Sequence, residues 1–216
     1  MLVGVPKEIK AQENRVGMSP AAVSDLVKAG HKVMVETNAG QGIFATDEDY
    51  IKAGAEIAGA PADIFAKADM IVKVKEPQPN ECAMLREGQI LFTYLHLAAD
   101  KPQAEALMKS GAVCIAYETV TGRNGGLPLL APMSEVAGRL AIQAGAWSLE
   151  RAHGGRGLLL GGVPGVPGAH VTIIGGGMVG RNALAMAVGS GANVTILERN
   201  VDVLRQLDDQ YGNRIT

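Results

Sequence analysis

The sequence predicts an α/β protein built from two doubly wound parallel-sheet domains. Short apolar or β-branched segments alternate with helical segments along the chain, which is typical of parallel sheets covered by helices. Glycine is abundant, at 28 of 216 residues, and aromatic residues make up only 4%, as expected of many tight strand–helix turns. A glycine-rich turn between a strand and a helix, within residues 171–188, marks the second domain.

The first domain is predicted to cover residues 1–130. Its strands are expected at residues 2–5, 32–36, 70–74, 90–93 and 113–116, and its helices at 20–29, 46–52, 62–67, 81–85 and 101–109. Ser19 before Pro20 is typical of a helix start with serine as the N-cap, and Gly30 is typical of a helix end. The segment Thr46-Asp-Glu-Asp49 has the pattern of a capping box, which predicts that the next helix begins there.

The second domain is predicted to cover residues 131–216 and to begin with a long helix that Ser134 caps and that ends at Arg151. A connector rich in glycine and proline, residues 153–168, follows this helix. Strands at 171–174 and 193–197 and helices at 178–188 and 201–210 complete the chain. A sheet of only two strands leaves edges and faces uncovered, so we expect the chain to be a truncated part of a longer protein. The alternative is that a partner supplies the missing strands.

The turn after residue 174 has the spacing of a dinucleotide-binding loop, G-x-G-x-x-G, between a buried strand and a helix. The first glycine permits a tight turn, the second a close approach of the backbone to a pyrophosphate, and the third close helix–strand packing. Free N–H groups at the helix start favour the phosphates. The expected cofactor-binding residues here are Gly175, Gly177, Met178, Val179 and Gly180. A tight turn in some other α/β domain is the alternative.

Glu198 ends the next predicted strand, 23 positions after Gly175, close to the ~20 expected of the acidic residue that binds the adenosine ribose. Its carboxylate would repel the 2′-phosphate of NADP, so the sequence predicts NAD as the cofactor. Arg199, the next residue, weakens that preference without reversing it.

Composition argues against several other classes of protein. The net charge is −2 and there is no run of Lys or Arg, so nucleic acid is not an expected partner. No stretch of 18 apolar residues predicts a membrane span, and Lys7, Glu8 and Lys10 interrupt any signal peptide. Cys82 and Cys114 are isolated from each other and from histidine clusters, which predicts buried thiols of a cytoplasmic protein and no metal site.

Four polar residues follow the predicted strands of the first domain, where ligands of parallel sheets bind: Arg15, Lys75, His96 and Glu118. An arginine can bind a carboxylate through two hydrogen bonds, a lysine can polarise a carbonyl, and a histidine can move protons near neutral pH. The alternatives are a surface ion pair for Arg15, a solvated pair with the adjacent glutamate for Lys75, and a structural role for His96. Glu118 either orients a base or caps a helix.

Several segments resemble known families. Residues 3–10, 13–16 and 72–77, the last reading Val-Lys-Val-Lys-Glu-Pro, resemble the superfamily of alanine dehydrogenase and proton-translocating transhydrogenase. A second set resembles alanine dehydrogenase more specifically, namely residues 91–99, 115–120, 129–139, 154–157 and 161–166. The resemblance extends over essentially the whole chain, from Met1 to beyond Glu198.

The resemblance implies the reversible oxidative deamination of L-alanine by NAD, which yields pyruvate, ammonium and NADH. In this family pattern Arg15 holds the substrate carboxylate, Lys75 binds the substrate and its carbonyl oxygen, and His96 is the acid/base. Met133 is implied in substrate binding, although a methionine is more often a core residue. Ser134 is implied to lie near the dinucleotide.

The family usually has aspartate where this chain has Glu198, which keeps the carboxylate on a side chain one methylene longer. It also carries a further catalytic aspartate, later strands and C-terminal helices that these 216 residues lack. We therefore expect this piece alone to be inactive, and the resemblance implies a homo-oligomer, commonly a hexamer. The alternatives are the NAD(H)-binding alpha subunit of a proton-translocating transhydrogenase, a saccharopine or lysine-type dehydrogenase, and, outside enzymes, an inactive NAD-binding module.

Overall fold

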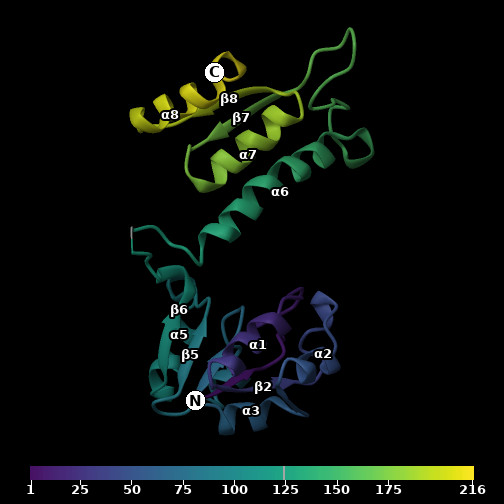
Figure 1. Ribbon diagram of the computed structural model, residues 1–216. Coiled ribbons are helices and arrows are strands. Elements are labelled where there is room, and N and C mark those ends of the chain that lie inside the picture. The colour runs from purple at the N-terminus through teal and green to yellow at the C-terminus, as the bar shows by residue number, and fades with distance from the viewer. Residues whose placement is uncertain (124) are drawn as a thin grey trace. The chain divides into compact units, whose positions relative to one another are not determined.

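Figure 1 shows the computed structural model of the protein, which describes residues 1–123 and 125–216. The chain forms two compact units, Met1–Leu127 and Pro128–Thr216, called here the N-terminal unit and the C-terminal unit. Helices and strands alternate in both units, so the predicted α/β class is confirmed.

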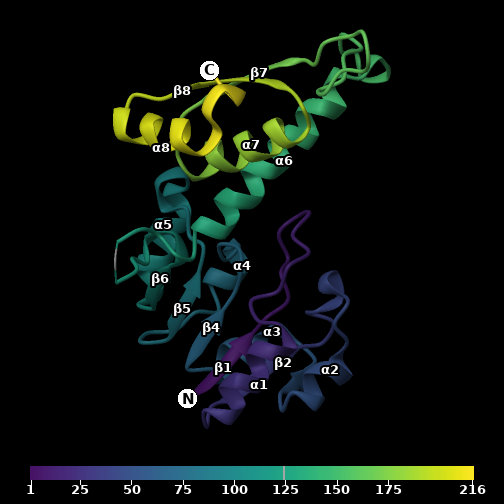
Figure 2. The same cartoon turned by 45° about the horizontal axis from the view of Figure 1, so that its top comes forward.

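The N-terminal unit contains a six-stranded, fully parallel sheet in the order β3-β2-β1-β4-β5-β6. Its strands are β1 Leu2–Val5, β2 Lys32–Glu36, β3 Glu56–Ala58, β4 Met70–Val72, β5 Ile90–Thr93 and β6 Val113–Ala116. The strand order reverses between β1 and β4, which lie side by side in Figure 2. A crevice forms at such a reversal, outside the carboxyl ends of the two strands, and it is where sheets of this kind bind ligands.

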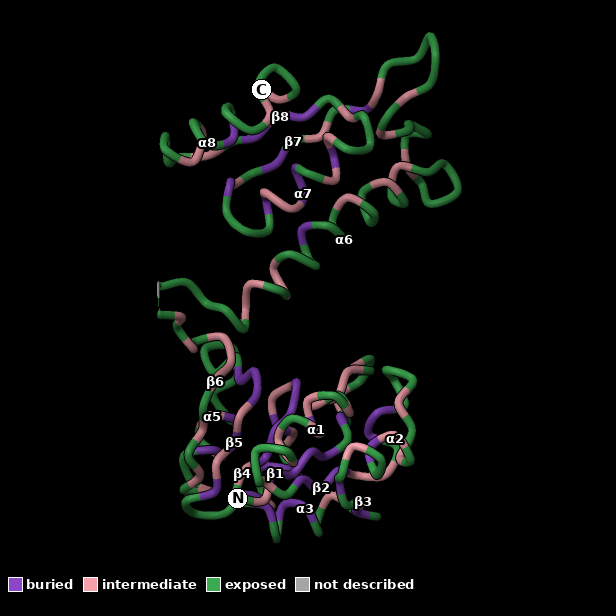
Figure 3. Tube along the Cα trace, viewed as in Figure 1, coloured by how far each residue is buried: buried purple, intermediate pink, exposed green. Residues whose placement is uncertain are grey.

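Helices cover both faces of this sheet. They are α1 Pro20–Lys28, α2 Asp47–Lys52, α3 Pro61–Lys67, α4 Pro79–Cys82 and α5 Lys101–Ser110. Successive residues of a strand point to opposite faces. On β2, Val33 and Val35 join a core cluster with Val23 of α1, whereas Met34 joins a separate cluster with Phe65 of α3 and Leu107 of α5. Figure 3 accordingly shows buried residues along the central strands β1, β2 and β4.

The predicted helix caps in this unit are confirmed. The Ser19 side chain accepts a hydrogen bond from the N–H of Ala22, and Thr46 and Asp49 form both hydrogen bonds of a capping box. The sequence did not predict β3, which has only three residues. In the structure β4 ends at Val72 instead of residue 74, although hydrogen bonds to the β5 side continue from Lys73 N–H to Phe92 O and from Tyr94 N–H to Val74 O.

The C-terminal unit contains a helix, α6, and then two β–α pairs. Its elements are α6 Ala131–Leu149, β7 His170–Ile174, α7 Met178–Gly189, β8 Asn193–Leu197 and α8 Val201–Tyr211. Strands β7 and β8 are parallel, with Val171 opposite Val194. Val194 also forms a parallel bridge with Ile215, so β8 has a neighbouring chain segment on both sides.

The expected start of α6 is wrong. The helix begins at Ala131 with a proline in its first turn, so Ser134 lies inside it and is not its N-cap. Gly138 is the point of close packing against α7, because a Cβ there would lie 2.2 Å from the carbonyl oxygen of Val179. Among the described residues no helix has the length and apolar character that a membrane span requires.

Candidate functional site

The carboxyl edge of the six-stranded sheet gathers the polar residues that the sequence singled out. Arg15 lies in the segment after β1, Lys75 follows β4, His96 follows β5 and Glu118 follows β6. These four strands are neighbours in the sheet, and all are parallel. The segments that follow them therefore emerge at one edge, beside the reversal between β1 and β4.

Arg15 is held by Glu13 through three hydrogen bonds. Its Nε and Nη2 donate to the two carboxylate oxygens of Glu13 at 2.8 and 2.6 Å, and its backbone N–H donates at 2.8 Å. This two-pronged geometry fixes the plane of the guanidinium. Arg15, and more weakly the charge of Lys75, lower the pKa of the Glu13 carboxyl to about 2. Arg15 and Lys75 thus act on the same carboxylate.

The Glu13–Arg15 pair is expected to make stability depend on pH. The pKa of Glu13 is about 2 in the folded protein, against 4.5 for an ordinary glutamate. A lowered pKa contributes stability that is complete above pH 4.5 and is lost as the pH falls towards 2. In urea unfolding between pH 6 and pH 3, the advantage of the wild type over Glu13→Gln should therefore shrink at low pH. A difference that is constant with pH would contradict this linkage.

His96 has a left-handed backbone conformation, with φ 51° and ψ 36°. Glu118 holds this backbone: its carboxylate accepts the N–H of His96 at 2.6 Å and the N–H of Leu95 at 3.1 Å. Burial raises the pKa of Glu118, but these N–H groups outweigh burial, so the pKa is lowered overall. The imidazole Nδ1 lies 4.0 Å from the same carboxylate. The structure therefore shows Glu118 fixing the loop that carries His96.

Tyr94, which the sequence analysis did not single out, contacts His96 and feels the charge of Arg15. Its ring is nearly parallel to the imidazole of His96, with centroids 5.9 Å apart, and nearly perpendicular to that of Tyr117, at 5.0 Å. Burial raises the pKa of Tyr94, and the charge of Arg15 partly opposes that rise. An aromatic residue among polar ones at a strand end was the signal that could have identified it.

A buried ion cluster of Glu8, Lys73 and Glu81 lies next to Lys75. Lys73 is fully buried, and its Nζ lies 3.1 Å from Glu8 Oε2 and 2.8 Å from Glu81 Oε1. The other oxygen of Glu8 accepts the N–H of Val74 at 2.6 Å and the N–H of Lys75 at 3.4 Å. Burial raises the pKa of Glu8, and the charge of Lys73 opposes that rise. The sequence analysis missed all three residues, although a lysine inside the apolar run before Lys75 was a signal.

In the C-terminal unit, the glycine turn has the geometry that the motif predicts. Gly175 has φ 100°, a conformation that favours glycine, and Gly177 precedes the first residue of α7. A Cβ on Gly180 would lie only 1.8 Å from the carbonyl oxygen of Gly175, so the helix and the turn are in contact there. Met178 and Val179 open the helix and are exposed.

Glu198 closes this turn from the end of β8. Its carboxylate accepts the N–H of Gly176 at 2.6 Å, of Arg199 at 2.7 Å and of Asn200 at 2.9 Å. The N–H groups of Asn200, Gly176 and Arg199 lower the pKa of Glu198, so it presents a negative charge beside the turn. Arg181 supports the other side by donating from Nε to the carbonyl of Gly176 at 2.9 Å.

The other predicted residues are placed as follows. Met133 and Ser134 are half-buried in the first turn of α6, so they belong to a different unit from Arg15, Lys75 and His96. Cys82 and Cys114 are free thiols. Within residues 1–123 and 125–216, no three His, Cys, Asp or Glu side chains are grouped in a way that could hold a metal ion.

Comparisons with known proteins agree with one another. The family model described as "Alanine dehydrogenase/PNT, N-terminal domain" matches residues 4–137, and its "C-terminal domain" counterpart matches residues 141–216. An alanine dehydrogenase of Methanococcus maripaludis is 56% identical over the whole chain, which spans 58% of that relative's length. A solved L-alanine dehydrogenase matches all of the chain and 59% of its own, with a TM-score of 0.94 and 53% identity.

A transhydrogenase from Sinorhizobium meliloti is more distant. Its structure matches 97% of the chain and 62% of its own length, with a TM-score of 0.82 and 28% identity. The two solved structures therefore share the fold, and the sequence of this chain is much closer to the L-alanine dehydrogenase.

Proposed function

Because the chain belongs to the alanine dehydrogenase/PNT family, we propose that it carries the substrate site and the adenosine side of the cofactor site of an NAD-dependent alanine dehydrogenase. The reaction is the reversible oxidative deamination of L-alanine to pyruvate and ammonium. The N-terminal unit is the substrate unit, and the C-terminal unit is the first part of the NAD-binding unit. We also propose a homo-oligomer, a hexamer by resemblance to the family.

The observation that carries this proposal is the gathering of Arg15, Lys75 and His96 at one edge of the sheet. A guanidinium, an ammonium and an imidazole match the three groups of pyruvate chemistry: a carboxylate, a carbonyl oxygen and a proton to be moved. A subunit that only exchanges hydride between nucleotides does not need this set. Transhydrogenase is therefore the second candidate, supported by the shared fold and by the shared family.

Each site residue of the N-terminal unit has its own proposed role. Arg15, oriented by Glu13, binds the substrate carboxylate and so aligns the Cα–H bond, which is an entropic gain. Lys75 donates to the carbonyl oxygen of pyruvate, or to the oxygen of the carbinolamine formed when water adds to the iminium. His96 takes up and returns the protons that move when water adds and ammonia leaves. Met133, which belongs to the C-terminal unit, is proposed as a further substrate-binding residue by resemblance to the family.

The residues around the glycine turn fit a dinucleotide. Gly175 and Gly177 leave room for a pyrophosphate, Gly180 lets the helix pack closely on the turn, and Met178 and Val179 offer backbone N–H groups. By resemblance to the family, Ser134 is proposed to bind the dinucleotide as well. The carboxylate of Glu198 binds the adenosine ribose hydroxyls and repels the 2′-phosphate of NADP, which selects NAD. When bound, NAD would accept the hydride that leaves the Cα of alanine.

The test uses the full-length protein, with L-alanine and NAD, and follows NADH formation. We expect alanine-dependent NADH formation, little with NADP, and the reverse reaction with pyruvate, ammonium and NADH. Hydride exchange between NAD(H) and NADP(H) without any alanine-dependent reaction would support transhydrogenase instead. A polypeptide limited to residues 1–216 is expected to be inactive, and turnover by it would show that nothing beyond these residues is needed.

A further inference from the structure

The short segment from Lys73 to Lys75, which leads from β4 into the substrate site, is held on both sides. Towards β5, the N–H of Lys73 donates to Phe92 O, and the carbonyl of Lys75 accepts from Thr93 Oγ1 at 2.9 Å. Towards β1, the N–H groups of Val74 and Lys75 donate to Glu8. The position of the Lys75 backbone therefore depends on a side chain that comes from the loop after β1.

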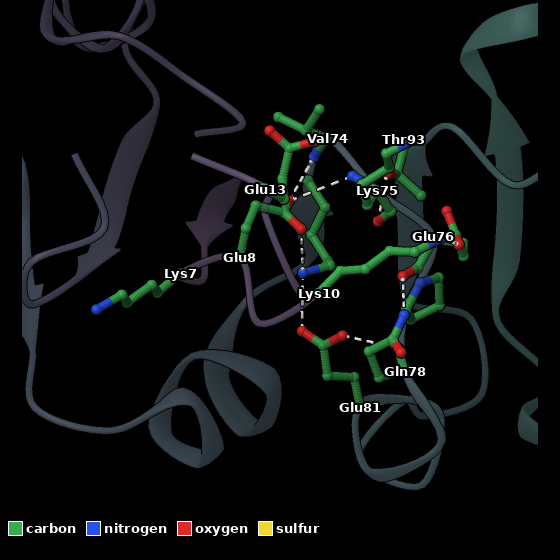
Figure 4. Close-up of polar contacts among 12 residues, drawn as sticks. Lys7, Glu8, Lys10, Glu13, Val74, Lys75, Glu76, Gln78, Glu81 and Thr93 are labelled. Atoms are coloured by element: carbon green, nitrogen blue, oxygen red, sulfur yellow. Dashed lines mark hydrogen bonds and ion pairs between the residues drawn. The ribbon is translucent and has the colours of Figure 1, made fainter. Parts of the chain in front are cut away.

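Glu8 uses its two oxygens for different purposes. Oε2 accepts from the ammonium of Lys73 at 3.1 Å, and Oε1 accepts the two backbone N–H groups at 2.6 and 3.4 Å. In Figure 4 the carboxylates of Glu8 and Glu81 face each other, and Val74 and Lys75 lie on the other side of Glu8. Only a carboxylate accepts at both ends at once, since an amide has one accepting atom.

The cost of this arrangement argues for a role beyond stability. The side chains of Glu8, Lys73 and Glu81 are 2%, 0% and 2% exposed, so each of these ions has lost nearly all of its hydration, which is unfavourable. Apolar residues of similar volume often stabilise such a site equally well. Apolar residues, however, cannot accept the N–H of Lys75, and that is what the cluster provides.

A second contact brings the same loop against the same segment. A Cβ on Gly17 would lie 2.4 Å from the carbonyl oxygen of Val72 and 3.2 Å from the Cα of Lys73. The segment from Glu8 to Gly17 therefore packs on the end of β4 at two points. Arg15 belongs to this segment, so one piece of chain both carries the guanidinium and holds the backbone of Lys75.

We propose that Glu8, with Lys73 as its buried counter-charge, is a positioning residue that fixes the Lys75 ammonium relative to the Arg15 guanidinium. This inference rests on the proposed function, in which Arg15 binds the carboxylate of the substrate and Lys75 its carbonyl oxygen. Glu8 itself does not touch the substrate. It sets the spacing between two groups that must act on adjacent carbons of one small molecule.

The test compares Glu8→Gln with the wild type in the full-length protein. The glutamine keeps the size of the side chain but turns an N–H₂ group towards either Lys73 or the two backbone donors. We expect kcat/KM for pyruvate to fall by roughly 10- to 100-fold, because a displacement of about 1 Å has that effect on catalysis. The Kd for NADH should stay within about twofold of the wild-type value, a change far smaller than the expected fall in kcat/KM.

Gln89→Met is the matched control, which shows how far a loss of stability alone changes kcat/KM. Gln89 is equally buried in the same unit, and its Nε2 donates to the carbonyls of Phe65 and Ala68 at 2.9 and 2.8 Å, before the start of β5. This variant should lower the thermal stability and leave kcat/KM within about twofold of the wild type. An equal loss of kcat/KM in both variants would overturn the positioning role.

Amide hydrogen exchange at Val74 and Lys75 is a readout that does not depend on activity. Exchange there should be about tenfold faster or more in Glu8→Gln, corresponding to the loss of about one hydrogen bond, and unchanged in Gln89→Met. Unchanged exchange in Glu8→Gln would overturn the contact, and faster exchange with unchanged kcat/KM would overturn its effect on catalysis. If Val74 and Lys75 exchange more slowly in the wild type than in Glu8→Gln but the wild type does not oxidise alanine, the proposed function is refuted and the Glu8 contact is not.

Glu8→Asp covers the case in which Glu8→Gln does not fold. Aspartate keeps the charge beside Lys73 but is one methylene too short to reach the backbone N–H groups as well. The same loss of kcat/KM and the same faster exchange are therefore expected with a smaller loss of stability. Kinetics and exchange equal to the wild type would refute the proposal.

Discussion

Replacing His96 by glutamine in the full-length protein is expected to lower kcat for alanine oxidation by roughly 10²- to 10⁴-fold, the range typical of losing a general acid–base. Glutamine keeps a polar side chain of similar length but cannot take up and return a proton. The backbone contacts of Glu118 to residues 95 and 96 do not involve the imidazole, so the loop should keep its position. The effect should therefore appear in kcat, with the Kd for NADH unchanged.

The control for this variant is His31→Gln. His31 lies just before β2, at the amino edge of the same sheet and away from the gathered residues. Steady-state kinetics of this variant should match the wild type. A kcat for His96→Gln within about threefold of the wild type would mean that another group moves the proton, because a general acid–base contributes far more than that.

The sequence predicted the sheet well because the signals for it are local. Alternation of apolar strands and helices, Ser19 as an N-cap and the capping box at Thr46 are all properties of a few adjacent residues, and each is found in the structure. The gathering of Arg15, Lys75 and His96 also followed from the sequence, since residues just after parallel strands meet at one edge. Whether they act as proposed remains a prediction.

The contacts that position these residues could not be predicted from local patterns. Glu8 and Lys73 are 65 positions apart, and Leu95 and Glu118 are 23 apart, so their pairing depends on how the strands are ordered. Lys73 and Lys75 look alike in the run Val-Lys-Val-Lys, yet one is fully buried and the other half-buried. Ser134 failed as a cap for a different and local reason, because Pro132 lies in the first turn of a helix that already begins at Ala131.

Lys73→Met is expected to destabilise the N-terminal unit by about 3–5 kcal/mol, the range for breaking a buried ion pair by removing one partner. Methionine fills most of the volume, so the loss comes from leaving the carboxylates of Glu8 and Glu81 buried without their counter-charge. The measurement is hydrogen exchange of the slowest amides in β4 and β5, which reports the free energy of opening of this unit by itself. A loss below about 1 kcal/mol would mean that the cluster relaxes towards water.

A double-mutant cycle with Glu81→Gln separates charge from packing. Glu81→Gln alone removes one partner of Lys73 but keeps an oxygen that accepts the N–H of Gln78. The double variant leaves one buried carboxylate instead of two, so its destabilisation should be smaller than the sum of the single effects, by about 0.5–3 kcal/mol. Strict additivity would show that Lys73 and Glu81 do not interact. If the two substitutions are coupled, the stability that the double variant still lacks relative to the wild type reports the cost of burying the Glu8 carboxylate without a counter-charge.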